Sequence, residues 1–331
     1  MLDLTLGIIG LGVGRRYARA ARAAGHRVIV CDLDQDRLDQ VCQEIAPLDR
    51  TTDWRQLVSD DRVDAVIVAS PDSLHRPMVL ETLRNGKHVL CETPLALRRS
   101  EAELLVEAVQ EAGVHAMAAH RLRFHPLVQR MRRELAALGP PTLVEARWLR
   151  PLRYELAGWR LDPALKRHLA IGEAVDLIDA LRWLAGDLFE VTGFALRRSR
   201  PDWPVADTIV CAGRYRSGAA LQLFLGIGGS GPSITEITVR GEGGTLSLDL
   251  EARQLALEGE RGVQVLEALP PEQEEGEEAW LLQAFVDLLR DGKGNPCSFV
   301  EAANAVATAL AIGDATAVNL PARIRPVVVE E

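Results

Sequence analysis

A glycine-rich turn near the start of the chain limits what its first part can fold into. Residues 4–9 are mostly apolar, and a helix-like stretch covers residues 15–24. The turn between these two segments contains Gly10, Gly12, Val13 and Gly14. Glycines at such a junction let the backbone bend tightly and let a pyrophosphate approach the amide groups at a helix N-terminus. Arg15 stands where a dinucleotide-binding pattern has its third glycine, so the turn alone is a weak signal.

Two side chains beside this turn have expected roles. Gly14 is expected to relieve crowding in place of the missing third glycine, and Arg15 is expected to reach a phosphate. Asp32 follows the strand-like residues 27–31 and lies about 20 positions after Gly10, where an acidic side chain accepts hydrogen bonds from an adenosine ribose. A carboxylate there repels a 2'-phosphate, which favours NAD over NADP. The alternative for Asp32 is an exposed aspartate in a turn.

The order of the remaining segments predicts two domains. Strand-like and helix-like segments alternate up to residue 120, which indicates a parallel sheet covered by helices. From residue 141 onward longer strand-like segments are separated by turns, and they occupy residues 142–149, 207–215, 219–226, 235–241 and 245–250. We therefore expect an α/β Rossmann domain over residues 1–120. An α+β domain with a large, mostly antiparallel open sheet is expected over residues 121–331.

Composition excludes several classes of partner. The chain has 331 residues, a hydrophobic content of 47% and a net charge of −9, so an acidic surface argues against nucleic acid and anionic membranes. No segment is long and apolar enough to suggest a membrane span. The five cysteines are odd in number and lack paired spacing, which favours reduced thiols in the cytoplasm and no metal site. An acidic run at residues 273–278 is interpreted as a solvated loop.

Three stretches give the chain a specific family resemblance. Residues 70–75 (SPDSLH), residues 85–96 (NGKHVLCETPLA) and residues 120–126 (HRLRFHP) closely resemble the glucose-fructose oxidoreductase / inositol dehydrogenase (Gfo/Idh/MocA) family. The sequence WRLDP at residues 159–163 looks like the family's approach to its substrate loop. The resemblance implies a nicotinamide cofactor held between the two domains and hydride transfer at a sugar or cyclitol carbon. It also implies a small-molecule substrate and frequent dimerisation through the open sheet.

The chain departs from the family at three chemical positions. The family motif E-K-P, whose lysine binds substrate and assists proton transfer, reads Glu92-Thr93-Pro94 here. Threonine carries no charge and cannot act as a base near neutral pH. In the family's D-x-G-x-H-x-x-D helix signature, the first aspartate is replaced by Gly172 and the histidine by Asp176. Only the last aspartate, Asp179, keeps its identity.

These departures leave two functional hypotheses open. In the first, an enzyme with an atypical site uses Thr93, Asp176 and Asp179, because two carboxylates three residues apart lie on nearly the same face of a helix and one can be raised in pKa to act as a base. In the second, the protein is a catalytically inactive sensor that binds NAD. The alternative for Asp176 is an ordinary carboxylate on a helix surface.

The remaining site predictions follow from the resemblance. The other side chains expected beside the cofactor are Ser70, Pro71, His75, Glu92 and Arg123. The side chains expected beside the substrate are His120, Trp159, Arg160, Lys166 and His168. Structural alternatives for them are a histidine bonded to backbone groups, aromatic core packing and a solvated basic turn. We also expect a homodimer, or a dimer of dimers, with the open sheets apposed.

Overall fold

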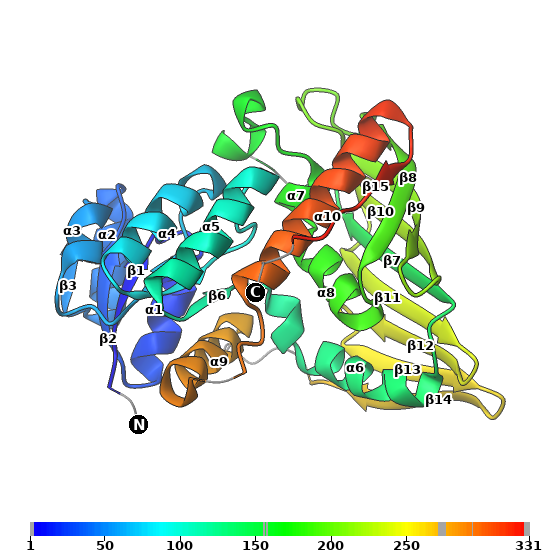
Figure 1. Ribbon diagram of the computed structural model, residues 1–331, viewed down its shortest axis with the longest axis horizontal. Coiled ribbons are helices and arrows are strands. Elements are labelled where there is room, and N and C mark those ends of the chain that lie inside the picture. Colours follow the sequence, from blue (N-terminus) through cyan, green and yellow to red (C-terminus); the bar gives the residue numbers. More distant parts are fainter. Residues whose placement is uncertain (1–2, 155, 157, 271–275, 293, 328–331) are drawn as a thin grey trace. The chain divides into compact units, whose positions relative to one another are not determined.

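The computed structural model describes residues 3–154, 156, 158–270, 276–292 and 294–327 (Figure 1). Among these residues the chain forms two compact units, which we consider separately. The first comprises residues 3–121 and 276–303, and the second comprises residues 122–270 and 304–327. No described helix is long and apolar enough to cross a membrane.

The first unit is built on a six-stranded parallel sheet. Its strands are β1 (Thr5–Ile9), β2 (Arg27–Cys31), β3 (Asp49–Thr51), β4 (Ala65–Val68), β5 (His88–Cys91) and β6 (Ala116–Ala118). Their order is β3-β2-β1-β4-β5-β6, so the chain reverses direction across the sheet between β1 and β4. In open α/β sheets a ligand binds outside the carboxyl ends of the strands at such a switch point.

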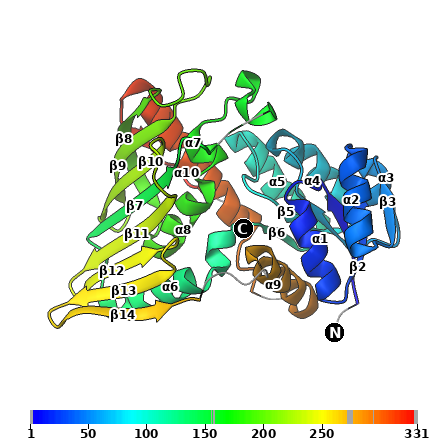
Figure 2. The same cartoon turned by 180° about the vertical axis from the view of Figure 1, so that it is seen from behind.

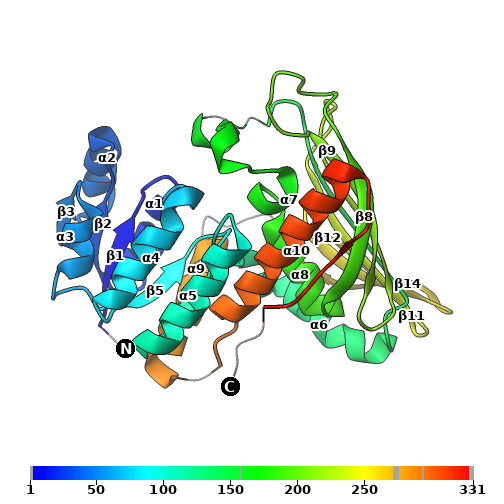
Figure 3. The ribbon, with the colours of Figure 1, turned by 45° about the horizontal axis from the view of Figure 1, so that its top comes forward.

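Helices connect these strands. They are α1 (Gly14–Ala23), α2 (Gln35–Ile45), α3 (Trp54–Ser59), the 3-10 turn η1 (Asp72–Leu74), α4 (His75–Arg84) and α5 (Arg99–Ala112), with α9 (Glu277–Asp291) added from the C-terminal part of the chain. Figure 3 shows α4 and α5 side by side along the sheet. Strand β1 is fully buried, and α1 turns Tyr17, Ala18 and Ala21 inward, as expected for a parallel sheet covered by helices.

The second unit is built on a nine-stranded sheet. Its strands are β7 (Leu143–Arg150), β8 (Leu188–Leu196), β9 (Thr208–Tyr215), β10 (Ala220–Ile227), β11 (Ile234–Gly241), β12 (Gly244–Asp249), β13 (Gln254–Gly259), β14 (Gly262–Ala268) and β15 (Ala322–Arg323). Their order is β14-β13-β12-β11-β7-β10-β9-β8-β15, and only the β7–β10 pair is parallel among the described strand pairs of this sheet. The helical segments are η2 (Arg121–Phe124), α6 (Pro126–Leu138), η3 (Gly158–Leu161), η4 (Pro163–Leu165), α7 (Leu169–Gly172), α8 (Val175–Ala185) and α10 (Phe299–Val318).

The two faces of this second sheet differ. Ile209 and Cys211 of β9 and Leu221 and Leu223 of β10 are buried on the face that contacts α6 and α7. Alternate residues point to the other face, over which Figure 2 shows none of the described helices. Charged side chains there pair across neighbouring strands, including Arg147 with Glu236 at 3.0 Å and Arg240 with Glu145 at 3.1 Å.

The predicted fold class is confirmed, with two corrections to its elements. Strands β8, β13 and β14 were not expected from the sequence, because β8 and β14 lack a regular alternation of buried and exposed residues. The acidic run also differs from expectation, although its residues 273–275 lie outside the described part of the chain. Glu278 belongs to α9, is buried, and pairs with Arg16 at 3.1 Å and Arg121 at 3.3 Å, so it is not part of a solvated loop.

Candidate functional site

The glycine turn has the shape that a nucleotide-binding loop requires. Gly10 has a φ of +88°, and a Cβ at this position would lie 2.6 Å from the carbonyl oxygen of Ala69, so only glycine fits. Gly12 is exposed, and a Cβ there would meet nothing within 4 Å, which leaves its backbone open to a ligand. A Cβ on Gly14 would lie 3.0 Å from Ile8, so Gly14 permits close packing of helix on strand. Val13 directly precedes α1 at its N-terminus.

Asp32 is bonded to this turn. Its Oδ2 atom accepts a hydrogen bond of 2.6 Å from the Leu11 amide, and its Oδ1 atom accepts one of 2.9 Å from the Asp34 amide. The carboxylate is 9% exposed, and the guanidinium of Arg37 lies 3.9 Å from it. Asp32 therefore holds the glycine turn from the end of β2, and the interpretation as an exposed turn aspartate does not fit its burial. Arg15 is directed instead to Glu44, with which it pairs at 2.8 Å.

His75 connects the loops that follow β4 and β5. One ring nitrogen lies 2.9 Å from the Ser70 carbonyl oxygen, and the other lies 2.8 Å from the Pro94 carbonyl oxygen. Only the doubly protonated ring can donate to two carbonyl groups at once. Burial acts to lower the pKa of His75, but Cys91, Asp72 and the Pro94 carbonyl outweigh it and raise the pKa to about 10. The ring is 1% exposed, and His75 holds the two loops together. A contact between His75 and the cofactor stays a prediction. Pro71 precedes the turn η1 that leads into α4.

Glu92 is held by its own neighbourhood. Its Oε1 atom accepts a 2.7 Å hydrogen bond from the Tyr17 hydroxyl, and its Oε2 atom accepts a 3.1 Å bond from the Thr93 amide. Burial, followed by the nearby Glu92 carboxylate, raises the pKa of Tyr17 well above its usual range, so Tyr17 remains a donor. The half-buried Thr93 lies at the end of this hydrogen-bonded segment. The cofactor role of Glu92 and the catalytic role of Thr93 stay predictions.

Arg123 and Asp179 form a buried ion pair in the second unit. The guanidinium donates two hydrogen bonds of 2.5 and 2.7 Å to the two carboxylate oxygens of Asp179, and Arg182 lies 3.7 Å from the same carboxylate. Arg123 is 3% exposed and Asp179 is fully buried. A two-pronged pair of this kind is strong and geometrically specific. It engages both oxygens that a proton-transferring Asp179 would use, whereas Asp176, on the same helix α8, is half-buried.

Replacing Asp179 with asparagine is expected to lower the free energy of unfolding by about 3–5 kcal/mol, because the buried Arg123 loses its counter-charge. Urea denaturation followed by circular dichroism measures this loss. Glu236→Gln is the matched control, since it removes one partner of an ion pair on the open sheet face and is expected to cost less than about 1 kcal/mol. Equal losses of unfolding free energy from the two substitutions would contradict a large contribution of the Arg123–Asp179 pair to stability.

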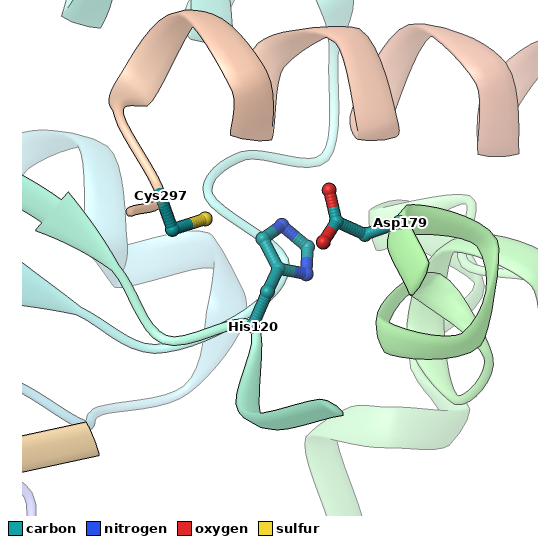
Figure 4. A group of neighbouring side chains, drawn as sticks. All are labelled: His120, Asp179 and Cys297. Atoms are coloured by element: carbon teal, nitrogen blue, oxygen red, sulfur yellow. The ribbon is translucent and has the colours of Figure 1, made fainter. Parts of the chain in front are cut away.

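His120 and Cys297 lie near each other in the first unit. Figure 4 shows the His120 side chain on the segment that follows β6 and Cys297 on the segment that precedes α10; it also labels Asp179 on α8. The Ala118 amide donates a 2.9 Å hydrogen bond to the Cys297 carbonyl oxygen, and this bond joins the two segments. His120 is fully buried in the described structure. Its role toward a substrate stays a prediction.

A second buried charge cluster surrounds Gly172 in the second unit. Arg167 pairs with Glu173 at 3.3 Å and donates a 2.9 Å hydrogen bond to the Gly172 carbonyl oxygen, and its guanidinium lies 4.8 Å from the ring centre of Trp159. The Tyr154 hydroxyl donates to the other oxygen of Glu173 at 2.6 Å. A Cβ on Gly172 would lie 2.8 Å from the Arg167 guanidinium. Arg167 therefore occupies the space that a side chain at position 172 would need.

Of the basic residues expected beside the substrate, Arg160 and His168 lie next to this cluster. Lys166 lies outside it. Arg160 stacks beside Trp159 with its guanidinium 5.5 Å from the ring centre. His168 precedes α7, and burial followed by the positive charge of Arg167 lowers its pKa to about 4. Lys166 is exposed and adopts a φ of 52°. A solvated basic turn therefore describes Lys166 but not the buried Arg167.

The buried His125 is expected to make the stability of the protein depend on pH. His125 caps α6 by accepting the Leu127 amide at its Nδ1 atom (3.3 Å), and burial followed by Arg253 lowers its pKa to about 4. Because the unfolded chain takes up this proton near pH 6.5 and the folded chain does not, the free energy of unfolding should fall as pH drops from about 6.5 to 4. His125→Asn keeps an acceptor at the cap and should flatten this decline by up to about 3 kcal/mol in chemical denaturation. An unchanged slope would contradict the assignment.

Two family models match the chain. An oxidoreductase family with an NAD-binding Rossmann fold matches residues 4–120, and the GFO/IDH/MocA C-terminal domain matches residues 128–247. The chain belongs to the GFO/IDH/MocA oxidoreductase family. The resemblance seen in the sequence is thereby confirmed, and the first unit is an NAD-binding Rossmann fold.

Individual relatives in this family differ in what they act on. The 2,7-anhydro-N-acetylneuraminate hydratase of Escherichia coli is 34% identical over 39% of this chain and 35% of its own length. The inositol 2-dehydrogenase of Rubrobacter xylanophilus is 31% identical over 56% of this chain and 54% of its own length. The chain thus aligns with about a third to a half of these proteins. A solved levoglucosan dehydrogenase in complex with NADH shares the fold, with a TM-score of 0.86 and 19% identity over 98% of this chain and 100% of that chain.

Several residues that shape the site were not expected from the sequence. Tyr17 holds Glu92, and Glu173 links Arg167 to Tyr154. A tyrosine on the inner face of the first helix carries no motif, and Glu173 is one of many acidic residues in the chain. The only available signal was the unusual loss of a side chain at Gly172, which implies that a neighbour fills the space.

Proposed function

We propose that the protein is an NAD-dependent oxidoreductase that transfers a hydride between the cofactor and a carbon of a sugar, cyclitol or related polyol. Asp32 carries the proposal, because this buried carboxylate is bonded to the Leu11 amide at the switch point of a parallel sheet. The open backbone at Gly12 supports the binding of a pyrophosphate beside it. Preference for NAD over NADP follows from the repulsion between the Asp32 carboxylate and a 2'-phosphate.

The acid–base groups of this proposed enzyme differ from those of the family motif. Thr93 can orient a hydroxyl group but cannot accept its proton near neutral pH. Asp179 is engaged by Arg123 on both oxygens, so Asp176 is the better carboxylate candidate for proton transfer on helix α8. The residues proposed to bind the substrate are His120, Trp159, Arg160, Lys166 and His168.

A second function is favoured by the same substitutions. Thr93, Gly172 and Asp176 replace the three groups that perform chemistry in the family motifs, while the glycine turn and Asp32 are intact. A protein with this combination would bind NAD and a ligand without turning it over, as a sensor. No part of the cofactor-binding loop needs to change for that role.

One assay separates the two functions. The purified protein is incubated with NAD, or with NADP, and a panel of sugars, inositols and sugar acids while absorbance at the wavelength of reduced nicotinamide is followed. Turnover with any compound would exclude the sensor. Tight NAD binding in calorimetry, combined with silence across the whole panel, would exclude the proposed dehydrogenase activity on these compounds.

Replacing Thr93 with lysine alone is expected to leave activity on the neutral members of the panel within about twofold of the parent protein. The lysine restores one charged group, but Gly172 and Asp176 still differ from the family motif, and groups that act as a unit do not contribute additively. The same absorbance assay measures the outcome, with Thr93→Ser as the control. A large gain of turnover from Thr93→Lys would show that positions 172 and 176 matter little.

We also propose a homodimer in which the open faces of the nine-stranded sheets meet. Phe194 and Leu196 of β8 are each 45% exposed, and Glu190 of the same strand forms a cross-strand ion pair with Arg214. A two-fold axis places the same mixed polar and apolar surface on both partners. Multi-angle light scattering that gave a monomer at micromolar concentration would refute the dimer.

A reducing cytoplasmic location is proposed on the ground that none of the five cysteines forms a disulfide in the described structure.

A further inference from the structure

Tyr17 joins two parts of the first unit at which the opposite halves of a dinucleotide are expected. It lies in α1, the helix that follows the glycine turn. Its hydroxyl donates a 2.7 Å hydrogen bond to the Oε1 atom of Glu92, the residue directly after β5. A pyrophosphate is expected at the glycine turn, and the nicotinamide is expected beyond the carboxyl end of a central strand. One contact between side chains therefore connects these two places.

This contact lies in the interior of the unit. Tyr17 is fully buried and Glu92 is 6% exposed. A hydrogen bond to a carboxylate is stronger than one between neutral groups, and low exposure to water strengthens it further. Burial, followed by the Glu92 carboxylate, raises the pKa of Tyr17 well above its usual range, so the hydroxyl keeps its proton near neutral pH. The contact thus has one stable arrangement, in which Tyr17 donates and Glu92 accepts.

The Glu92 carboxylate keeps acceptor sites for a further group. Its Oε2 atom accepts a 3.1 Å hydrogen bond from the Thr93 amide, so each of the two oxygens has one donor. A carboxylate oxygen can accept about two hydrogen bonds. The two donors fix the plane of the carboxylate and leave about one acceptor site on each oxygen. Two such sites side by side match two neighbouring hydroxyl groups, or a hydroxyl and an amide.

Helix α1 and the glycine turn are held by other contacts. Arg16, the neighbour of Tyr17 in the helix, pairs with the buried Glu278 of α9 at 3.1 Å. The glycine turn is fixed by the bond from the Leu11 amide to Asp32. Removing the Tyr17 hydroxyl alone should therefore leave the helix and the turn in place. Its effect should be concentrated on the orientation of the carboxylate.

We propose that Tyr17 is a positioning residue for the nicotinamide half of the cofactor. It acts through Glu92, by holding the carboxylate in the orientation that accepts hydrogen bonds from this half, and it makes no contact with the cofactor itself. The inference rests on the proposed NAD-dependent function and adds to it a residue that belongs to no sequence motif.

The test compares the affinities of Tyr17→Phe for NADH and for ADP, which lacks the nicotinamide half. The Kd for NADH in fluorescence titration should rise about tenfold, because the carboxylate loses a hydrogen bond that fixes it. The Kd for ADP in calorimetry should stay within about twofold of the parent value. At saturation, the fluorescence anisotropy of bound NADH should fall, because the nicotinamide is less restrained. A general weakening of the site would affect both ligands equally and would overturn the proposal.

Tyr215→Phe is the matched control. Tyr215 is also buried, but its hydroxyl has no hydrogen-bond partner within the described parts of the chain. Loss of this hydroxyl should change neither Kd by more than about twofold. A tenfold loss of NADH affinity in Tyr215→Phe would show that any buried tyrosine has this effect, and would overturn the assignment to Tyr17.

A double-mutant cycle tests whether Tyr17 acts through Glu92. In a Glu92→Ala background, Tyr17→Phe should raise the Kd for NADH by less than about twofold more, because the group that it positions is already absent. Two independent tenfold losses would overturn the proposal.

The same protein samples separate this inference from the proposed redox function. NADH binding that depends on Tyr17, together with no reduction of NAD by any compound of the sugar panel, would uphold the positioning role and refute the redox function. Turnover in the panel with NADH affinity unchanged in Tyr17→Phe would do the reverse. A parent protein that bound no NADH would refute both.

Discussion

Replacing Asp32 with alanine is expected to raise the Kd for NAD by roughly 10- to 100-fold, because a hydrogen bond to a charged group contributes about 1.5–3 kcal/mol. The same change removes the repulsion of a 2'-phosphate, so affinity for NADP should rise or stay level. The ratio of the two affinities should therefore move toward NADP by at least about 10- to 100-fold. Arg37, whose guanidinium lies 3.9 Å from Asp32, is available to pair with the phosphate in the variant.

The control for this prediction lies two residues away. Asp34 caps α2 by accepting the amides of Asp36 and Arg37, and Asp34→Asn keeps that cap while leaving Asp32 in place. Its ratio of NAD to NADP affinity should stay within about threefold of the parent protein in fluorescence titrations of the reduced cofactors. Because Asp32 also accepts the Leu11 amide, a Asp32→Asn variant separates the loss of charge from the loss of the acceptor. An unchanged ratio in both Asp32 variants would refute the ribose contact.

The features of the fold that are set by residues close together in the sequence could be predicted. Gly10 and Gly14 perform the two steric roles that the turn pattern requires, and Gly14 replaces the missing third glycine as expected. Alternation of strands and helices indicated a parallel sheet, and the longer strands indicated the second sheet. These inferences succeed because backbone conformation and close packing within one βα unit are decided over a few residues.

The contacts that shape the candidate site were not predictable in the same way. Tyr17 and Glu92 are 75 positions apart in the chain, and Arg123 and Asp179 are 56 positions apart. Either partner could pair with many residues until the fold selects one. The sequence therefore suggested Arg123 and Asp179 as separate functional residues, for the cofactor and for catalysis, whereas the structure joins them in one ion pair. The sequence does not show which carboxylates are buried, so it cannot distinguish an aspartate in a buried ion pair from a catalytic aspartate.

Gly172 offers a test in which the sign of the effect depends on one neighbour. Gly172→Ala is expected to lower the free energy of unfolding by about 1–3 kcal/mol, because the new Cβ would lie 2.8 Å from the Arg167 guanidinium and displace it from Glu173. In an Arg167→Ala background that contact is absent. Alanine replaces glycine at the end of a helix there, so the same substitution should be neutral or stabilising by up to about 1 kcal/mol.

A double-mutant cycle in urea measures the coupling between these two positions, and Gly231→Ala is the control because a Cβ there meets nothing within 4 Å. Additive effects of Arg167→Ala and Gly172→Ala would refute the steric relation. If the coupling is found, position 172 cannot carry the aspartate of the family motif while Arg167 keeps its pair with Glu173. The absence of an aspartate at position 172 and the presence of the buried Arg167 then depend on each other. The Arg167 guanidinium then fills the space that a side chain at position 172 would need.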